Sequence, residues 1–113
     1  MKKDDSVYLN DILSCINKIE MYIAGLSRET ALSVNYLRDA VYRNFEVIGE
    51  AAKRLSDDFV EEHPELNLHQ VIGMRNQLIH GYDDIRDEIV WKTIKDDLPI
   101  LKKQIKKILK SGS

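Results

Sequence analysis

The chain has only one cysteine, Cys15, among its 113 residues. A single thiol cannot form an intrachain disulfide, so the fold must depend on its apolar core, and a reducing cytoplasm is compatible with this composition. The three histidines do not stand at metal-ligand spacing with each other or with the cysteine, which argues against a zinc site. We therefore expect a cytoplasmic protein with no metal and no cofactor.

Long apolar runs and several common motifs are also missing. No stretch approaches the ~18 uninterrupted apolar residues of a transmembrane helix, and no apolar segment follows the charged first residues, so we expect neither membrane insertion nor a signal peptide. A glycine-rich phosphate loop and a Gly-x-Ser-x-Gly elbow are absent. With 17 basic and 19 acidic residues the net charge is −2, so binding to nucleic acid would require a local basic patch.

The pattern that is present is helical. Apolar residues recur every three or four positions, with neither strand-like alternation nor internal repeats. We expect a first helix capped by Ser6, and then Ser27 either caps a short helix or opens the second one early. A long second helix carries its apolar face from Leu37 to Phe59 and ends before His63-Pro64, since a residue preceding proline avoids the helical conformation.

Two further helices complete the prediction. The third ends near Gly81, and the apolar stripe of the last runs from Val90 to Leu109. Pro99 falls on the polar side of that last helix, so we expect a kink and not a break. The sequence thus predicts an all-α, up-and-down bundle of four to five helices, with one domain over residues 1–110 and a disordered tail at 111–113.

The chain is organised around the segment 73–82, where polar residues interrupt a helical apolar pattern. Arg75 projects from the middle of an apolar stripe, where a guanidinium costs several kcal/mol unless an acceptor compensates it. Asn76 and His80 share the adjoining edge. Because Arg75 and His80 are five residues apart, an undistorted helix separates them by about 140°. A symmetric dimer through this helix would let two copies share one phosphate.

Each of these residues also has a purely structural interpretation. Arg75 can form an ion pair with Glu50 or a hydrogen bond with Asn44 inside the bundle, and such networks perturb charges without any function. His80 can be a solvated residue at a helix end, and Tyr82 can pack over that end. A basic group near the C-terminus suits either the helix dipole or an RNA backbone. It comprises Lys102, Lys103, Lys106, Lys107 and Lys110.

Arg75, Asn76, His80 and Tyr82 match the R-N-x-x-x-H-x-Y form of the HEPN signature. The segment 43–55, Arg-Asn-Phe-Glu-Val-Ile-Gly-Glu-Ala-Ala-Lys-Arg-Leu, resembles the second helix of the HepT-like subgroup. The segments Ile89-Val-Trp and Asp97-Leu-Pro and the lysine-rich helix after them are similar too. The chain therefore resembles a HepT-like toxin of the HEPN superfamily over nearly its whole length.

This resemblance implies a toxin of a two-gene system that acts as a metal-independent ribonuclease and is neutralised by a minimal nucleotidyltransferase. It implies a homodimer whose motif helices line a shared cleft for RNA. By carry-over, Arg75 and His80 are the catalytic pair, Asn76 positions the substrate, and Tyr82 accepts AMP from the antitoxin. The alternative is a non-catalytic HEPN module that binds a nucleotide or a nucleotidyltransferase through the same polar cluster.

Overall fold

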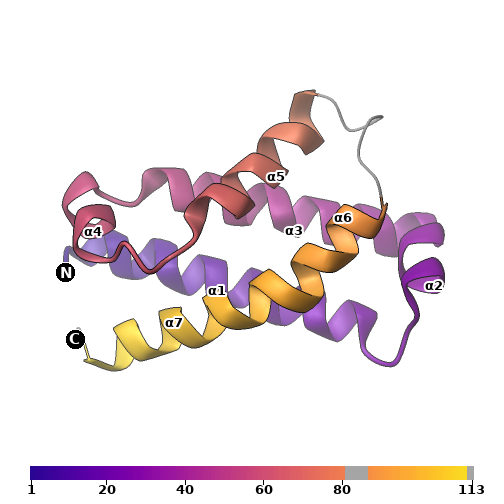
Figure 1. Cartoon of the computed structure of the whole chain (residues 1–113), viewed down its shortest axis with the longest axis horizontal. Helices are drawn as coiled ribbons and strands as arrows, with labels where there is room; N and C mark the ends of the chain where they lie inside the picture. The colour runs from indigo at the N-terminus through magenta and orange to yellow at the C-terminus, as the bar shows by residue number, and fades with distance from the viewer. Residues whose placement is uncertain (81–86, 112–113) are drawn as a thin grey trace.

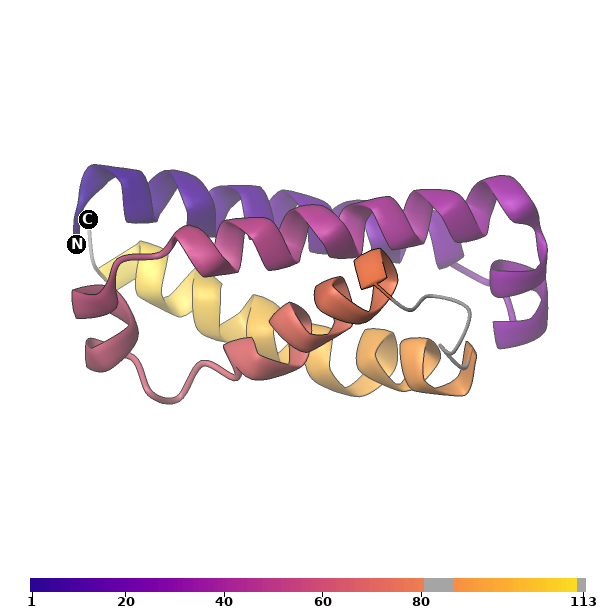
Figure 2. The same ribbon diagram turned by 90° about the horizontal axis from the view of Figure 1, so that it is seen from above.

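The computed structural model describes residues 1–80 and 87–111, except for the side chains of 78–80. Two long helices, α1 and α3, lie side by side along the molecule, with α5 packed on α3 and α7 packed on α1 (Figures 1 and 2). Every element in the described ranges is helical, which confirms the all-α prediction. The long helices are α1 (Lys3–Ile23), α3 (Asn35–Arg54), α5 (Leu68–His80) and α7 (Leu98–Ser111).

Short helices connect the long ones. α2 (Arg28–Ser33) and α4 (Asp57–Glu62) lie at opposite ends of the molecule (Figure 1). α6 (Asp87–Lys92) and the π-helical turn η2 (Thr93–Asp97) run directly into α7, so that the three form one rod. The side chain of Ser27 accepts a hydrogen bond from the Thr30 amide and caps α2. This selects the first of the two roles expected for Ser27.

One continuous core joins the long helices. It contains the stripes expected from the sequence, including Ile12, Ile16 and Ile19 of α1 and Phe45 and Ile48 of α3, all with no exposed surface. These residues recur every three or four positions, so that each helix buries one face and leaves the other to solvent. The C-terminal half of α5 leans away from this core, as Figure 1 shows.

The expected cap at Ser6 is wrong. α1 already begins at Lys3, and Ser6 lies within it. The reason is Asp5, which is only 2% exposed and binds a residue on a distant segment. Its carboxylate accepts hydrogen bonds from the Ser56 amide at 2.8 Å and from the Ser56 hydroxyl at 2.6 Å. Two hydrogen bonds compensate the buried charge and fix the start of α1 to the start of α4.

The expected second helix is in fact two helices. α3 ends at Arg54 and α4 begins at Asp57, with Ser56 between them as the N-cap. The Ser56 hydroxyl accepts a bond from the Phe59 amide at 3.2 Å while donating to Asp5. The chain therefore turns at Ser56 because a carboxylate on α1 holds it in an extended conformation. α4 does end before His63-Pro64, as expected.

The last rod confirms that proline does not break the helix. Pro99 is exposed, and the helix continues past it instead of breaking. The π-helical turn Thr93–Asp97 immediately precedes it. Because proline cannot donate to the preceding turn and its ring crowds the carbonyl four residues back, a wider turn relieves that clash. α7 continues through Ser111, the first residue of the expected tail, and 112–113 lie outside the described residues.

No helix in the described ranges is both long enough and apolar enough to cross a bilayer.

Candidate active site

Residues 73–80 of the segment singled out from the sequence lie on α5, which packs against α3. Gly49 of α3 faces Arg75 of α5, and a Cβ atom built on Gly49 would lie 2.2 Å from the Arg75 Cβ and 2.6 Å from its Cγ. Real side chains never approach so closely, so only glycine permits this contact. The sequence analysis did not single out Gly49, because the reason for a glycine there is a side chain on another helix.

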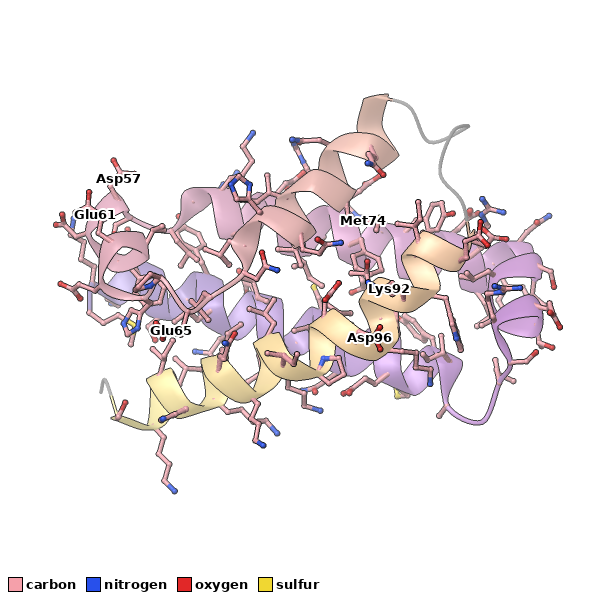
Figure 3. The ribbon with its side chains drawn as sticks, in the orientation of Figure 1. Asp57, Glu61, Glu65, Met74, Lys92 and Asp96 are labelled. Carbon is pink, nitrogen blue, oxygen red and sulfur yellow. The ribbon has the colours of Figure 1, made fainter. Side chains whose placement is uncertain are left out.

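The aliphatic stem of Arg75 is enclosed between α5 and α3. Its side chain is 20% exposed, and the neighbouring Met74 is 3% exposed on the inner side of α5 (Figure 3). Val71, one turn earlier, is 1% exposed. The expectation that an arginine interrupts an apolar face is therefore confirmed, and the guanidinium emerges at the edge of the core.

The guanidinium of Arg75 is only partly satisfied. One terminal nitrogen, Nη1, donates to the Asn76 side-chain oxygen at 3.2 Å, and Nη2 lies 4.0 Å from the Glu50 carboxylate. The Nε atom is buried and has no hydrogen-bond partner among the described residues. At 4.0 Å the Glu50 contact is at the outer limit of an ion pair, and Glu50 is 45% exposed. Such a pair contributes little to stability.

The two supporting residues expected from the sequence thus differ. Glu50 lies within ion-pair range of Arg75. Asn44, which is 8% exposed, donates its side-chain amide to the Ala40 carbonyl of its own helix at 2.8 Å. The hydrogen bonds found in the described residues do not connect Asn44 with Arg75. Asn44 therefore satisfies its own burial within α3, as a polar group inside an apolar face must.

The helical register separates Arg75 from His80. α5 is α-helical from Leu68 to His80, so that the two Cα positions differ by about 140° around its axis. Position 80 falls on the same side as Gly73 and Asn76, within about 40° of each. The side chain of His80 is not among those described, and Gly81 and Tyr82 lie outside the described residues. Within Leu68–His80 the helix is regular, so this part of α5 keeps the two positions on different sides.

The outer side of α5 is open. A Cβ atom on Gly73 would meet nothing within 4 Å, and Asn76 and Gln77 are exposed. Where its side chains are described, this face carries a glycine and two amides, with no apolar side chain among these three residues. A cavity of about 720 Å³ lies at the other end of α5 and is lined by residues such as Leu68, His69 and Ile72. It does not include Arg75.

One further group lies on the same face of α3 as Gly49, two turns nearer the start of that helix. Burial raises the pKa of the Tyr42 phenol above its ordinary value, so it is neutral at physiological pH. The Arg38 guanidinium lies 5.0 Å from the centre of its ring and pairs with Asp87 of α6 at 3.5 Å. These residues connect the start of α6 to α3.

Residues 12–108 match the model of the family described as Ribonuclease HepT-like. The chain belongs to the HepT-like family. This confirms the resemblance drawn from the motif and from the segments around Arg43 and Pro99. The match extends over both helices that meet at Gly49 and Arg75, so the contact described above lies within the family domain.

Curated relatives support the same assignment. A protein of Thermococcus cleftensis named "Probable ribonuclease HepT" is 37% identical over 110 residues, which cover 97% of this chain and 100% of that protein. A Methanocaldococcus jannaschii protein provisionally named an RNase is 36% identical over 96% of this chain and 94% of its own length. Another from Caldanaerobacter subterraneus subsp. tengcongensis is 37% identical over 90% and 91%. No solved structure matches the chain.

Proposed function

We propose that this HepT-like protein is a metal-independent RNA endonuclease that uses Arg75 and His80. The family and the ribonuclease names of its relatives support an RNA substrate. The observation that carries the proposal is the guanidinium of Arg75, held at the edge of the core with a buried Nε that has no partner among the described residues. A cation stabilised so weakly by its own fold is suited to a phosphate supplied by a substrate.

The reaction needs only groups that the motif provides. The ribose 2′-hydroxyl attacks the adjacent phosphorus, the bond from phosphorus to the 5′-oxygen breaks, and a 2′,3′-cyclic phosphate and a 5′-hydroxyl result. The imidazole of His80, with an unperturbed pKa near ~6.5, can accept the proton of the 2′-hydroxyl or supply one to the leaving oxygen. Arg75 neutralises charge on the nonbridging oxygens, and Asn76 positions the phosphate.

We propose further that two copies of the chain form the site. Arg75 faces α3, whereas position 80 falls on the open side of α5 with Gly73, so one chain alone divides the pair between two faces. A homodimer through the outer sides of α5 would place two arginines and two histidines around one cleft. Arg75 of one copy and His80 of the other would then face the same phosphate.

Regulation follows from the position of Tyr82, two residues after His80. We propose that the protein is the toxin of a cytoplasmic toxin–antitoxin pair and that a minimal nucleotidyltransferase silences it by transferring AMP from ATP to Tyr82. The Tyr82 oxygen would form the bond to the α-phosphorus of ATP, the bond to the β-phosphate would break, and pyrophosphate would leave. The transferred nucleotide adds bulk and negative charge beside the catalytic histidine, which would block the cleft and repel substrate phosphate. Co-purification with a nucleotidyltransferase encoded by an adjoining reading frame would test this pairing.

The test of the reaction is cleavage of a defined RNA by the purified protein in excess chelator. We expect cyclic-phosphate products from the unmodified chain and a loss of about 10²-fold or more in His80→Ala. Arg43→Gln is the matched control, because Arg43 is exposed and its pair with Glu46 lies on the surface. Equal cleavage by His80→Ala would remove that residue from the mechanism. RNA binding without any cleavage would favour the non-catalytic binding module.

The shared site is tested by mixing. Light scattering should report a dimer at micromolar concentration, and a strict monomer would contradict the arrangement. If Arg75 and His80 of different copies act on one phosphate, co-refolding inactive Arg75→Met with inactive His80→Ala should partly restore cleavage, because mixed dimers then carry one intact pair. No recovery in verified mixed dimers would mean that every arginine and histidine of the dimer is required or that each pair acts within one chain.

A further inference from the structure

The charge of the chain is distributed unevenly. Five of its 17 basic residues and none of its 19 acidic residues lie in α7, so the rest of the chain carries 12 basic against 19 acidic residues. In contrast, α1 mixes the two signs in its first turn, and α4 carries acidic residues but no basic ones. The C-terminal helix is thus a compact basic element on an otherwise acidic protein. Any anionic macromolecule approaching the molecule would be attracted to α7 first.

One lysine of α7 has a structural role. Lys102 is 24% exposed, and its ammonium donates to the Glu20 carboxylate of α1 at 2.5 Å. This pair connects the two helices whose apolar faces meet below it. The ion pair with Glu20 therefore accounts for Lys102 within the fold. The surroundings of the other four lysines can be compared with it.

The other four lysines have no such explanation. Lys103, Lys106, Lys107 and Lys110 are all exposed, and none has a carboxylate within 4.0 Å among the described residues. Their helical positions fall within about 100° of one another, on the side opposite the buried stripe. We call these four residues the α7 lysine face. Of the four, Lys107 acts on one acidic residue, Glu65. The pKa of the Glu65 carboxyl is lowered mainly by its own backbone amide, then by His63, and then by Lys107.

The lysine face costs stability instead of adding to it. Lys103 and Lys107, like Lys106 and Lys110, are four residues apart, and each such like-charge pair destabilises a helix by about 0.2–0.5 kcal/mol. The helix dipole favours lysine only in the last turn, which contains Lys110 alone of the four. A solubilising surface would not need one sign, since mixed charges serve as well. The arrangement therefore indicates an anionic partner.

We propose that the α7 lysine face binds the phosphate backbone of RNA outside the cleavage site. This rests on the proposed ribonuclease function and adds to it a second contact with the substrate. Residues 103–110 span about 10 Å of helix, which can face about three phosphates of a helical strand. Lysine is suited to this contact because its flexible ammonium neutralises phosphate without reading the base.

The position of the face makes the contact dependent on RNA length. α7 runs along the edge of the molecule away from the upper end of α5, where the motif helix ends (Figure 1). The acidic side chains Asp57 and Glu61 lie on α4, away from α7 (Figure 3). A trinucleotide at the cleavage site would not reach the lysine face, whereas a longer RNA would. The face should therefore determine the apparent affinity for long substrates and leave the chemical step unchanged.

The test replaces all four lysines of the face with glutamine in the full chain. The control replaces Lys2, Lys3, Lys18 and Lys53 with glutamine, since these are exposed lysines on other helices or at the N-terminus and their loss changes the net charge equally. Binding of a labelled 20-nucleotide RNA is measured by fluorescence anisotropy in the His80→Ala background, so that cleavage does not interfere. Steady-state cleavage of the same RNA and of a trinucleotide is measured with His80 intact.

We expect the α7 variant to bind the 20-nucleotide RNA about tenfold more weakly or worse, and to show a smaller slope of log affinity against log salt by about 0.7 for each lost phosphate contact. Its KM for the long RNA should rise with kcat and trinucleotide cleavage unchanged. The control should bind within about twofold of the parent. If both variants bind the 20-nucleotide RNA equally weakly, only the net charge matters and the proposal is overturned.

Two double variants, Lys103→Gln with Lys107→Gln and Lys106→Gln with Lys110→Gln, guard against a folding defect in the quadruple change. Each should give an intermediate loss. Normal RNA binding by all α7 variants, with weaker binding of the nucleotidyltransferase, would assign the face to an acidic protein surface and contradict the proposal. If the parent protein does not cleave RNA, but RNA binding still depends on the α7 lysine face and not on the control lysines, the proposed catalysis is wrong and the proposed binding surface is supported.

Discussion

The two sides of α5 are built for different purposes. The inner side meets α3 at a glycine, with the Arg75 stem in the space that a Cβ of Gly49 would otherwise fill. The outer side also carries a glycine, Gly73, but a Cβ there would meet nothing within 4 Å. One glycine is required by this chain's own packing, and the other is not. The inner side therefore fixes the arginine, whereas the described part of the outer side is open at Gly73.

The largest effect is expected from a substitution at Gly49, where α3 meets the inner side of α5. Gly49→Ala forces α5 away from α3 or distorts the Arg75 stem, so we expect a loss of about 1–3 kcal/mol in unfolding free energy. Because a displacement of about 1 Å can cost 10²-fold in rate, RNA cleavage should fall by tenfold or more at a temperature where the variant is folded. Urea unfolding and single-turnover cleavage measure the two effects. Unchanged values for both would show that the close contact is unnecessary.

The matched change on the outer side is Gly73→Ala. Alanine favours a helix over glycine by up to about 1 kcal/mol, and the space is open, so each chain should keep or gain stability. If the outer sides of two α5 helices pack together, the added methyl group should weaken the dimer. Sedimentation or light scattering over a dilution series gives the dimer affinity. A tighter or unchanged dimer would place the interface elsewhere.

A smaller effect is expected from Glu65, which precedes α5. The backbone amide of Glu65 itself, and then His63, lower the pKa of its carboxyl below the ordinary value. A lowered pKa in the folded state contributes stability above the unfolded value near ~4.3, and this is lost as the pH falls through the folded pKa. Glu65→Gln should therefore reduce the loss of stability between about pH 4 and pH 2. Identical urea midpoints of both proteins across this range would contradict it.

The helices themselves could be predicted from the sequence, but their ends and closest contacts could not. Stripes such as Ile12, Ile16 and Ile19 are local patterns that any partner surface would bury. The break at Ser56 depends on Asp5, which is 51 residues away, and no periodicity reports such a pair. The sequence singled out the residues around Arg75 because an arginine in an apolar stripe violates the local pattern. It did not reveal Gly49, since glycine inside a helix has several possible reasons.

In the lysine-rich helix α7 the sequence shows the residues, but only the structure distinguishes their roles. The sequence shows all five lysines, and both interpretations of them remained open. Only the structure separates Lys102, which pairs with Glu20, from the four that face outward. Composition identified the charge, and the arrangement of helices identified which part of it the fold does not use.

The most direct test of the account is the replacement of Arg75 by methionine, which keeps the aliphatic stem against Gly49 and removes only the guanidinium. The two quantities to measure are the unfolding free energy in urea and the single-turnover rate of RNA cleavage in chelator. We expect stability within about 1 kcal/mol of the parent and a cleavage rate about 10²-fold lower or worse. A loss of about 3 kcal/mol or more with cleavage retained in the folded fraction would show that Arg75 is a structural ion pair and would contradict the account.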